Sequence, residues 1–203
     1  MDELSSRTNY IFTLIKFFLF LIILCFLVEM SKAFWQELHA RESFSLNILV
    51  LGIISSFAFS VFIADQHKFY RNIQNFFFRT SFFSLLFPSL LILLSVGYFF
   101  IPKILGTGFN KDIFIFLGGF VLITHLSFVA RETQGHNFST VIHYLFIFSI
   151  LYILNLILLS SYLRIGFRVH VGKIIVEGIK GCLLYTSDAA DELDGVDLGG
   201  RRI

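Results

Sequence analysis

Long stretches without a single charged residue constrain this chain more than any other feature of its sequence. Residues 43–64, 80–102, 113–130 and 139–163 contain no Asp, Glu, Lys or Arg. A helix needs about 20 mostly apolar residues to cross the hydrocarbon core of a bilayer, where every backbone polar group must be hydrogen-bonded within the segment. The four stretches therefore predict four membrane-spanning helices.

A fifth apolar segment, near the N-terminus, is interrupted by charge. Its core, residues 17–28, is too short alone and lies between Lys16 and Glu29. Extended back to Tyr10 the segment is long enough, with the Lys16 amine reaching toward the nearer interface. A cleaved signal peptide is the alternative, but no small-residue cleavage site follows the segment. We therefore expect a retained helix.

Together the five segments predict an all-α fold, a polytopic transmembrane helix bundle of about five spans. The membrane domain covers residues 1–181, and its spans are expected at approximately 10–30, 45–64, 79–101, 113–130 and 140–162. Composition agrees, because 56% of the residues are hydrophobic and 15% are charged, whereas a soluble domain usually carries about 25% charged residues. The connections are short, so no soluble domain is expected between the spans.

The distribution of positive charge bears weakly on orientation. With five spans, more Lys and Arg residues fall on the side of the C-terminus than on the opposite side, and cytoplasmic loops carry an excess of these residues. We therefore expect a multi-pass protein of the cell membrane with a cytoplasmic C-terminus. The compact cluster of Lys68, Arg71 and Arg79 on the opposite side argues for the reverse orientation.

A basic amphipathic juxtamembrane segment, residues 164–181, follows the last predicted span. If it is helical from about Val171, Ile174 and Ile175 lie on one side and Lys173 lies on the other. Such segments normally lie in the headgroup layer, attracted to anionic lipid. A linker into a further cytoplasmic domain is equally compatible with this pattern.

The last segment, residues 182–203, breaks sharply from what precedes it. It holds five of the acidic residues and no Phe. Back-translation of residues 182–192 and 196–203 gives sequences that resemble the two fixed parts of a transposase-type sequencing-library adapter, with room for a sample index between them. We therefore expect a non-native tail and a natural chain that is followed only to about Gly181. A genuine acidic disordered tail is the alternative.

Three polar residues inside the predicted spans are candidates for chemistry: His125, His143 and Asn155. Polar groups within a membrane are costly, so a functional role is the first hypothesis, here a proton relay or a ligand contact. The alternative is interhelical hydrogen bonding, at about 0.6 kcal/mol for each bond. No two of the histidines have i, i+4 spacing and no carboxylate accompanies them within a span, so we predict no metal site and no cofactor.

Small residues and one proline indicate how the helices pack. Gly52, Ser56 and Ser60 recur at every fourth position and so share one face of the second predicted span. Small residues at this spacing let helix backbones approach closely in lipid, which predicts a packing seam within the chain, with a homodimer interface as the alternative. Pro88 lies in the middle of the third span, where the loss of one helical hydrogen bond predicts a kink.

Function is only weakly indicated. No catalytic residue can be named, since the sequence has no nucleophile–base motif, HExxH, P-loop or dinucleotide fingerprint. The leading hypothesis is a non-enzymatic membrane accessory or scaffold protein whose partners are the lipid bilayer and other membrane proteins, and not nucleic acid. The alternatives are the N-terminal membrane anchor or sensor region of a longer protein, and a small transporter- or channel-like bundle.

Overall fold

The described part of the chain is helical apart from its turns. The computed structural model describes residues 2–41, 44–62, 66–105, 110–133 and 138–194. Within these ranges there are eight α-helices and no strand. In chain order the helices are α1 (Asp2–His39), α2 (Leu46–Phe62), α3 (Gln66–Phe77), α4 (Ser81–Leu86), α5 (Ser89–Leu105), α6 (Lys111–Thr133), α7 (Phe138–Phe167) and α8 (Val171–Asp194). The predicted all-α fold is confirmed.

Three helices are long and apolar enough to cross a membrane. They are Ile11–His39 in α1, Lys111–Thr133 in α6 and Val141–Phe167 in α7, which correspond to the first, fourth and fifth predicted spans. α2 and α3 pass the same test only as a pair, bent by 112°, and α5 is a shorter apolar helix. The structure thus gives three candidate spans, and the predicted count of about five is not confirmed.

The structure differs from the prediction in the third predicted span, residues 79–101. A single kinked helix is expected there from the sequence, but α4 ends at Leu86 and α5 begins at Ser89. Phe87 lies between them in an extended conformation, with φ −116° and ψ 121°, which a residue before proline prefers. Because Pro88 has no N–H and its ring clashes with the preceding turn, the helix breaks here instead of bending.

A helix also occupies residues that the sequence predicts as a connection. The buried residues of α3 are Gln66, Tyr70 and Gln74, and their four-residue spacing places them on one face of the helix. Phe69 and Phe76 are exposed on other sides. α3 therefore presents a polar face to the bundle and aromatic side chains outward, an arrangement opposite to that of a soluble amphipathic helix.

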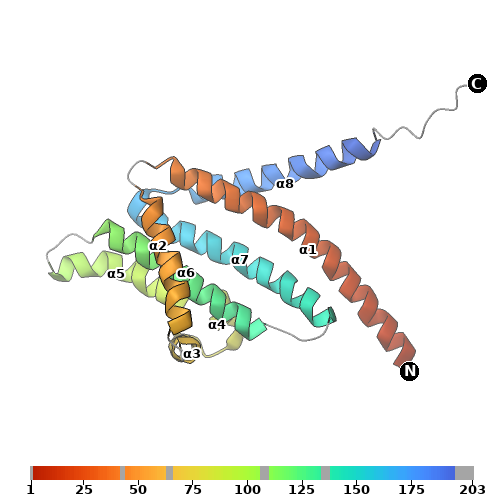
Figure 1. The fold of residues 1–203 in the computed structure, drawn as a ribbon, viewed down its shortest axis with the longest axis horizontal. Coiled ribbons are helices and arrows are strands. Elements are labelled where there is room, and N and C mark those ends of the chain that lie inside the picture. Colours follow the sequence, from red (N-terminus) through yellow and green to blue (C-terminus); the bar gives the residue numbers. More distant parts are fainter. Residues whose placement is uncertain (1, 42–43, 63–65, 106–109, 134–137, 195–203) are drawn as a thin grey trace, which may run out of the picture.

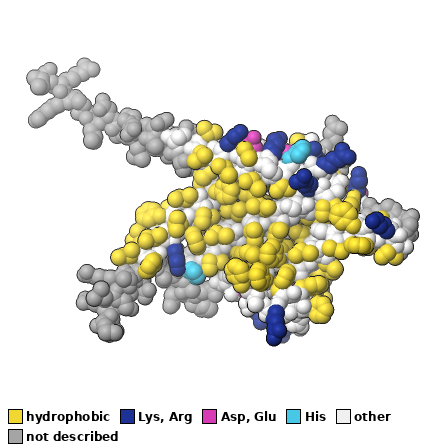
Figure 2. Space-filling view, turned by 180° about the vertical axis from the view of Figure 1, so that it is seen from behind, with side chains coloured by type: hydrophobic (Ala, Val, Ile, Leu, Met, Phe, Trp, Pro, Cys, Tyr) yellow, Lys and Arg dark blue, Asp and Glu magenta, His cyan; other side chains and the backbone are white. Residues whose placement is uncertain are grey.

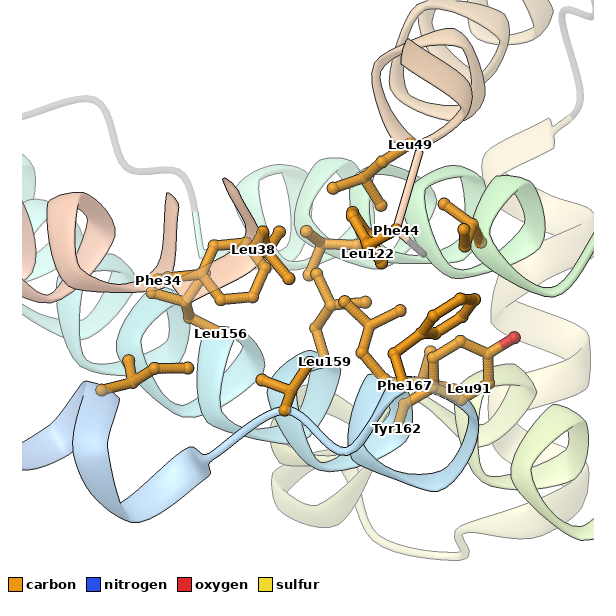
Figure 3. Packing of buried hydrophobic residues seen from close by; sticks show 14 of the residues in the cluster. Phe34, Leu38, Phe44, Leu49, Leu91, Leu122, Leu156, Leu159, Tyr162 and Phe167 are labelled. Atoms are coloured by element: carbon orange, nitrogen blue, oxygen red, sulfur yellow. The ribbon is translucent and has the colours of Figure 1, made fainter. Parts of the chain in front are cut away.

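α6 lies at the centre of the bundle. α2 crosses it, and α5 and α7 lie beside it (Figure 1). Within its most apolar window 61% of the residues are buried, against 28% for α7. The close view of the core shows Leu122 of α6 between Leu49 of α2 and Leu159 of α7 (Figure 3). The side chains that α6 contributes are therefore enclosed by helices on several sides.

Two glycines allow α2 to lie almost against the backbone of α6. A Cβ atom added to Gly119 would lie 2.5 Å from the carbonyl oxygen of Leu49, and one added to Gly52 would collide with the carbonyl oxygen of Phe116. No larger residue fits either position without moving a helix backbone. The crossing is the close approach that small residues permit between membrane helices.

α8 lies beside the C-terminal half of α1 at the edge of the bundle (Figure 1). It begins at Val171 and continues to Asp194, so the helix includes part of the segment 182–203. Ile174 is buried, and a Cβ atom at Gly178 would lie 3.1 Å from Met30 of α1. The juxtamembrane segment is therefore packed on the chain's own first helix along this face.

A buried carboxylate holds the turn between α7 and α8. Glu37 is only 3% exposed, yet it forms ion pairs with Arg41 and with Lys173, the latter at 3.2 Å. The backbone N–H of His170 donates to Glu37 Oε1 at 3.2 Å. Arg168 in this turn has φ 56°, a left-handed conformation that non-glycine residues adopt rarely. Glu37 thus links the end of α1 to the start of α8.

The N-terminal half of α1 is the least packed apolar helix in the structure. No residue from Ile11 to Val28 is buried, and the N-terminal end of α1 reaches beyond the other helices (Figure 1). Figure 2 shows hydrophobic side chains over most of one face of the molecule, with Lys and Arg toward its edges. An apolar surface bordered by positive charge is typical of a protein that faces lipid.

Candidate functional site

His125 of α6 is the centre of a buried polar cluster. Its side chain is fully buried, together with Tyr70 and Gln74 of α3. The Tyr70 hydroxyl donates to His125 Nδ1 at 3.0 Å, and Gln74 Nε2 lies 2.8 Å from the Tyr70 hydroxyl oxygen and 3.0 Å from the same Nδ1. With Nδ1 as an acceptor, His125 carries its proton on Nε2.

The break at Pro88 provides the acceptor for that proton. His125 Nε2 donates to the carbonyl oxygen of Leu85, at 3.2 Å. Leu85 lies in the last turn of α4, where carbonyl groups have no partner inside their own helix. In a continuous helix this carbonyl would accept a hydrogen bond within the helix. The interruption of the predicted third span frees the carbonyl, and the buried His125 can therefore donate to it.

A pocket opens next to this cluster between α2, α3 and α6. Its volume is about 260 Å³, and its wall includes Ser60 of α2, Gln66 and His67 of α3, and Thr124 and Arg131 of α6. Tyr70 lines the same pocket, so the His125 cluster lies directly behind its wall. The pocket thus combines a buried amide, hydroxyl groups and a cationic side chain around one opening.

An ion-paired group borders the pocket. Arg71 of α3 forms an ion pair with Glu132 of α6, and His67 Nε2 lies 3.4 Å from the same carboxylate. Burial lowers the pKa of the His67 imidazole, the Arg71 and Arg131 charges lower it further, and Glu132 acts in the opposite direction. α3 lies outside the three candidate spans, and this ion pair fixes it to the end of α6.

The small-residue face of α2 points toward α6. Gly52 lies at the backbone crossing described above, and the buried Ser56 hydroxyl lies 2.9 Å from Thr124 Oγ1. Since the Thr124 hydroxyl itself donates to the carbonyl of Phe120, Ser56 is the donor in this bond. Ser60 donates to the carbonyl of Phe57 in its own helix and lines the pocket. The structure therefore places Gly52 and Ser56 of the predicted packing seam against α6, and Ser60 at the pocket.

The other two predicted polar residues lie apart from His125. Asn155 of α7 is fully buried and donates through Nδ2 to the Leu151 carbonyl of its own helix, while Oδ1 has no partner among the described residues. His143 is exposed near the start of α7 and accepts a hydrogen bond from Lys16 of α1 at 3.3 Å. None of the hydrogen bonds described joins two of the three residues.

The described residues show no arrangement for metal binding. Within them no group of three or more His, Cys, Asp or Glu side chains is close enough to hold an ion.

Sequence reasoning missed the α3 half of the site. His125 was visible as a polar residue in an apolar helix, but its partners Tyr70 and Gln74 lie in a segment that the sequence predicts as a connection. One signal could have revealed them: Gln66, Tyr70 and Gln74 recur at four-residue spacing, a polar face on an otherwise Phe-rich helix. Glu37 could not be singled out from the sequence, because the spans are predicted from stretches without charged residues.

Comparisons with known proteins find no relative. No protein-family model matches the chain, and neither the curated proteins nor the solved structures include a match.

Proposed function

We propose that this chain is a five-pass integral membrane protein that works without catalysis, as an accessory or scaffold subunit, and that the N-terminal half of α1 binds an apolar transmembrane helix of another membrane protein. The observation that carries the proposal is the contrast between apolar helices within one chain. In the most apolar window of α1 no residue is buried, whereas 61% of the corresponding window of α6 is buried.

Support for two further passes comes from contacts along α6. His125 bonds to Leu85, and the Phe114 ring lies 4.7 Å from the ring of Tyr98. Residues 85–98 therefore run alongside α6 in the opposite direction, and the stretch of α6 from Phe114 to His125 between the two contacts is about 16 Å long at 1.5 Å per residue. This is roughly half the thickness of a hydrocarbon core, which is consistent with α4 and α5 being the two halves of one broken pass.

α2 covers the same depth in the direction of α6. Gly119 lies against Leu49, and Thr124 bonds to Ser56. Residue numbers therefore increase in the same direction along both helices, which are parallel. α1 and α7 also run in a common direction, because Lys16 bonds to His143 and Ser31 to Tyr152. Since α6 runs opposite to α7, an even number of passes must separate α1 from α6, and α2 with α4–α5 supplies two.

This arrangement bears on the proposed location in the cell membrane. The side that holds the C-terminal end of α1, the start of α6 and α8 carries Arg41, Lys111, Arg164 and Lys173. The opposite side carries fewer Lys and Arg residues, among them Lys68, Arg71 and Arg79. The positive-inside rule therefore favours a cytoplasmic α8.

Cysteine labelling tests the five passes. Arg79→Cys and Lys111→Cys, each in a background with Cys25 and Cys182 replaced by serine, are labelled in intact cells with a membrane-impermeant maleimide. Five passes predict that the two positions lie on opposite sides, so only Arg79→Cys is labelled before lysis. Labelling of both positions from one side would contradict five passes and support a re-entrant α2–α5 segment.

Photo-crosslinking in native membranes tests the docking surface. A photoreactive residue at Phe18 of α1 is compared with one at Ile54 of α2, since the two side chains are 56% and 58% exposed. We expect a discrete adduct with one other membrane protein from Phe18 and only lipid adducts from Ile54. Lipid adducts alone from both positions would overturn the scaffold proposal and leave α1 as a simple lipid anchor.

A transporter-like function is the second candidate, and the buried His125 cluster is what favours it. A histidine held between Tyr70, Gln74 and the Leu85 carbonyl could pass a proton or contact a polar solute. Measuring flux into proteoliposomes that contain the His125→Leu variant distinguishes the two functions. The scaffold proposal expects the variant to give the same flux as the unsubstituted protein. Loss of flux in a folded variant would favour transport.

A further inference from the structure

The pocket between α2, α3 and α6 contains a buried acceptor that none of the described residues satisfies. Gln66, the first residue of α3, is 8% exposed. Its Nε2 points to Thr124 Oγ1 at 3.5 Å, and its carbonyl oxygen Oε1 has no hydrogen-bond partner among the described residues. An unsatisfied buried amide oxygen destabilises the folded state, so a molecule that donates a hydrogen bond there would stabilise the protein.

Positive charge lines the same pocket. Arg131 of α6 is part of its wall, and no hydrogen bond or ion pair engages its guanidinium within the part of the chain that the structure describes. α3 begins at the pocket with Gln66 and His67, so the positive end of the dipole of a 12-residue helix faces it. Among the described residues, Glu132 beside the pocket has its carboxylate paired with Arg71 and close to His67.

Hydroxyl groups and aromatic rings complete the wall. Ser127 and Thr124 lie along α6, and Phe57 and Phe128 close the apolar side. With a volume of about 260 Å³, the pocket is large enough for a small polar group and too small for a drug-sized molecule. The pocket thus offers a cation and a helix N-terminus for an anion, an amide acceptor for a hydroxyl donor, and an apolar edge.

From this combination we infer that the pocket binds a phosphate ester that carries a free hydroxyl, with Arg131 and the start of α3 on the phosphate and Gln66 Oε1 accepting from the hydroxyl. A guanidinium and a helix N-terminus are the groups that proteins use most readily for phosphate. The same chemistry occurs in the headgroup of phosphatidylglycerol and in free glycerol phosphate. This inference concerns α2, α3 and α6 and does not depend on what α1 binds.

The test uses the full-length protein purified in detergent, with two probes that separate the two sources. Binding of phosphatidylglycerol, with phosphatidylcholine as the reference lipid, is measured by native mass spectrometry, and binding of glycerol 3-phosphate by calorimetry. Binding of phosphatidylglycerol alone assigns the pocket to a lipid headgroup. Binding of glycerol 3-phosphate, with competition between the two, assigns it to a soluble ester.

Two variants and a matched control locate the binding. Arg131→Gln removes the cation, and Gln66→Glu keeps the shape of the side chain while placing negative charge at the acceptor. Each is expected to weaken binding of the effective probe at least about tenfold, the size of a charge-assisted hydrogen bond. Arg79→Gln, an exposed arginine between α3 and α4, should leave binding unchanged.

Three results would overturn the inference. They are the absence of binding of both probes to the folded protein, equal binding of phosphatidylglycerol and phosphatidylcholine, and an equal loss in the Arg79→Gln control. Thermal unfolding of each variant in the same detergent shows whether it is folded. If Gln66→Glu fails to fold, the comparison of Arg131→Gln with Arg79→Gln decides the question alone.

Discussion

α6 and the N-terminal half of α1 are both apolar enough to cross a membrane, but they have opposite surroundings. α6 is enclosed by α2, α5 and α7, and 61% of its most apolar window is buried, whereas no residue is buried in that of α1. The difference lies in the residues between the apolar ones. α6 carries Gly118, Gly119, Thr124 and His125, which permit close backbones and interhelical hydrogen bonds.

Hydropathy therefore identifies membrane helices, but it does not distinguish a helix that contacts lipid from one that contacts other helices. Leu, Ile and Phe pack equally well against lipid and against another helix, because both surroundings are apolar. Small and polar residues distinguish a helix that its own chain encloses from one that is left to lipid or to a partner. The first two predictions below test the packing of α6, the third tests the Glu37 ion pairs at the end of α1, and the last tests the exposed half of α1.

The largest effect is expected at the crossing of α2 and α6. Gly52→Ala places a Cβ atom against the carbonyl oxygen of Phe116, so one backbone must move, and we expect a loss of about 3 kcal/mol in the free energy of unfolding. Unfolding in mixed micelles with increasing denaturing detergent measures it. Gly172→Ala is the control, because a Cβ atom there meets nothing within 4 Å. Equal stability of the two variants would show that the helices do not cross here.

The second largest effect is expected at His125. His125→Leu removes the partner of Tyr70, of Gln74 and of the Leu85 carbonyl, leaving buried polar groups unsatisfied at a cost of about 2 kcal/mol. The same unfolding assay measures this loss. His143→Leu, at an exposed histidine with a single bond to Lys16, should change the stability by less than about 0.5 kcal/mol. If the two substitutions were equally costly, the burial of His125 would be disproved.

A smaller effect is expected at Glu37. Glu37→Gln keeps the size and the acceptor for the His170 N–H but removes the charge that Arg41 and Lys173 share. Both cations reach solvent, so the expected loss is about 1 kcal/mol. Limited proteolysis should cut the turn between α7 and α8 faster in this variant. An unchanged cleavage rate would mean that the carboxylate does not hold this turn.

The smallest effect on stability is expected in the exposed half of α1. Phe18→Ala and Ile22→Ala should each change the free energy of unfolding of the isolated protein by less than about 0.5 kcal/mol, because neither side chain packs within the chain. Ile22→Ala should also lower the yield of the adduct that a photoreactive residue at position 18 forms in native membranes. A loss of 2 kcal/mol or more in the isolated protein would place this half of α1 in the core.

The sequence predicted the long uninterrupted helices well, and the reason is physical. α1, α6 and α7 are each long and apolar enough to cross a membrane, so their existence follows from hydropathy alone. The broken pass at residues 79–101 was harder to predict. Pro88 was visible, but whether a helix bends or breaks depends on whether the freed carbonyl groups find donors, and the donor for Leu85 is His125 on another helix.

The candidate site could be predicted only in part. His125 stands out in an apolar helix, whereas its partners lie 51 and 55 residues away along the chain and in a segment polar enough to pass for a loop. The small residues of α2 indicated a seam, but the sequence of α2 alone does not say which helix lies against it. The pocket depends on α3 folding back toward α6, a tertiary contact that local patterns do not contain.

Lipid access to single tryptophans tests the difference between α1 and α6 most directly. The only natural tryptophan, Trp35, is replaced by Phe, and a reporter is introduced by Phe18→Trp or by Phe128→Trp, at positions that are 56% and 4% exposed. In bilayers of brominated phospholipid, we expect strong quenching of fluorescence at position 18 and little at position 128. Equal quenching at both positions, or stronger quenching at position 128, would contradict an α6 enclosed by the bundle and an α1 left open to its surroundings.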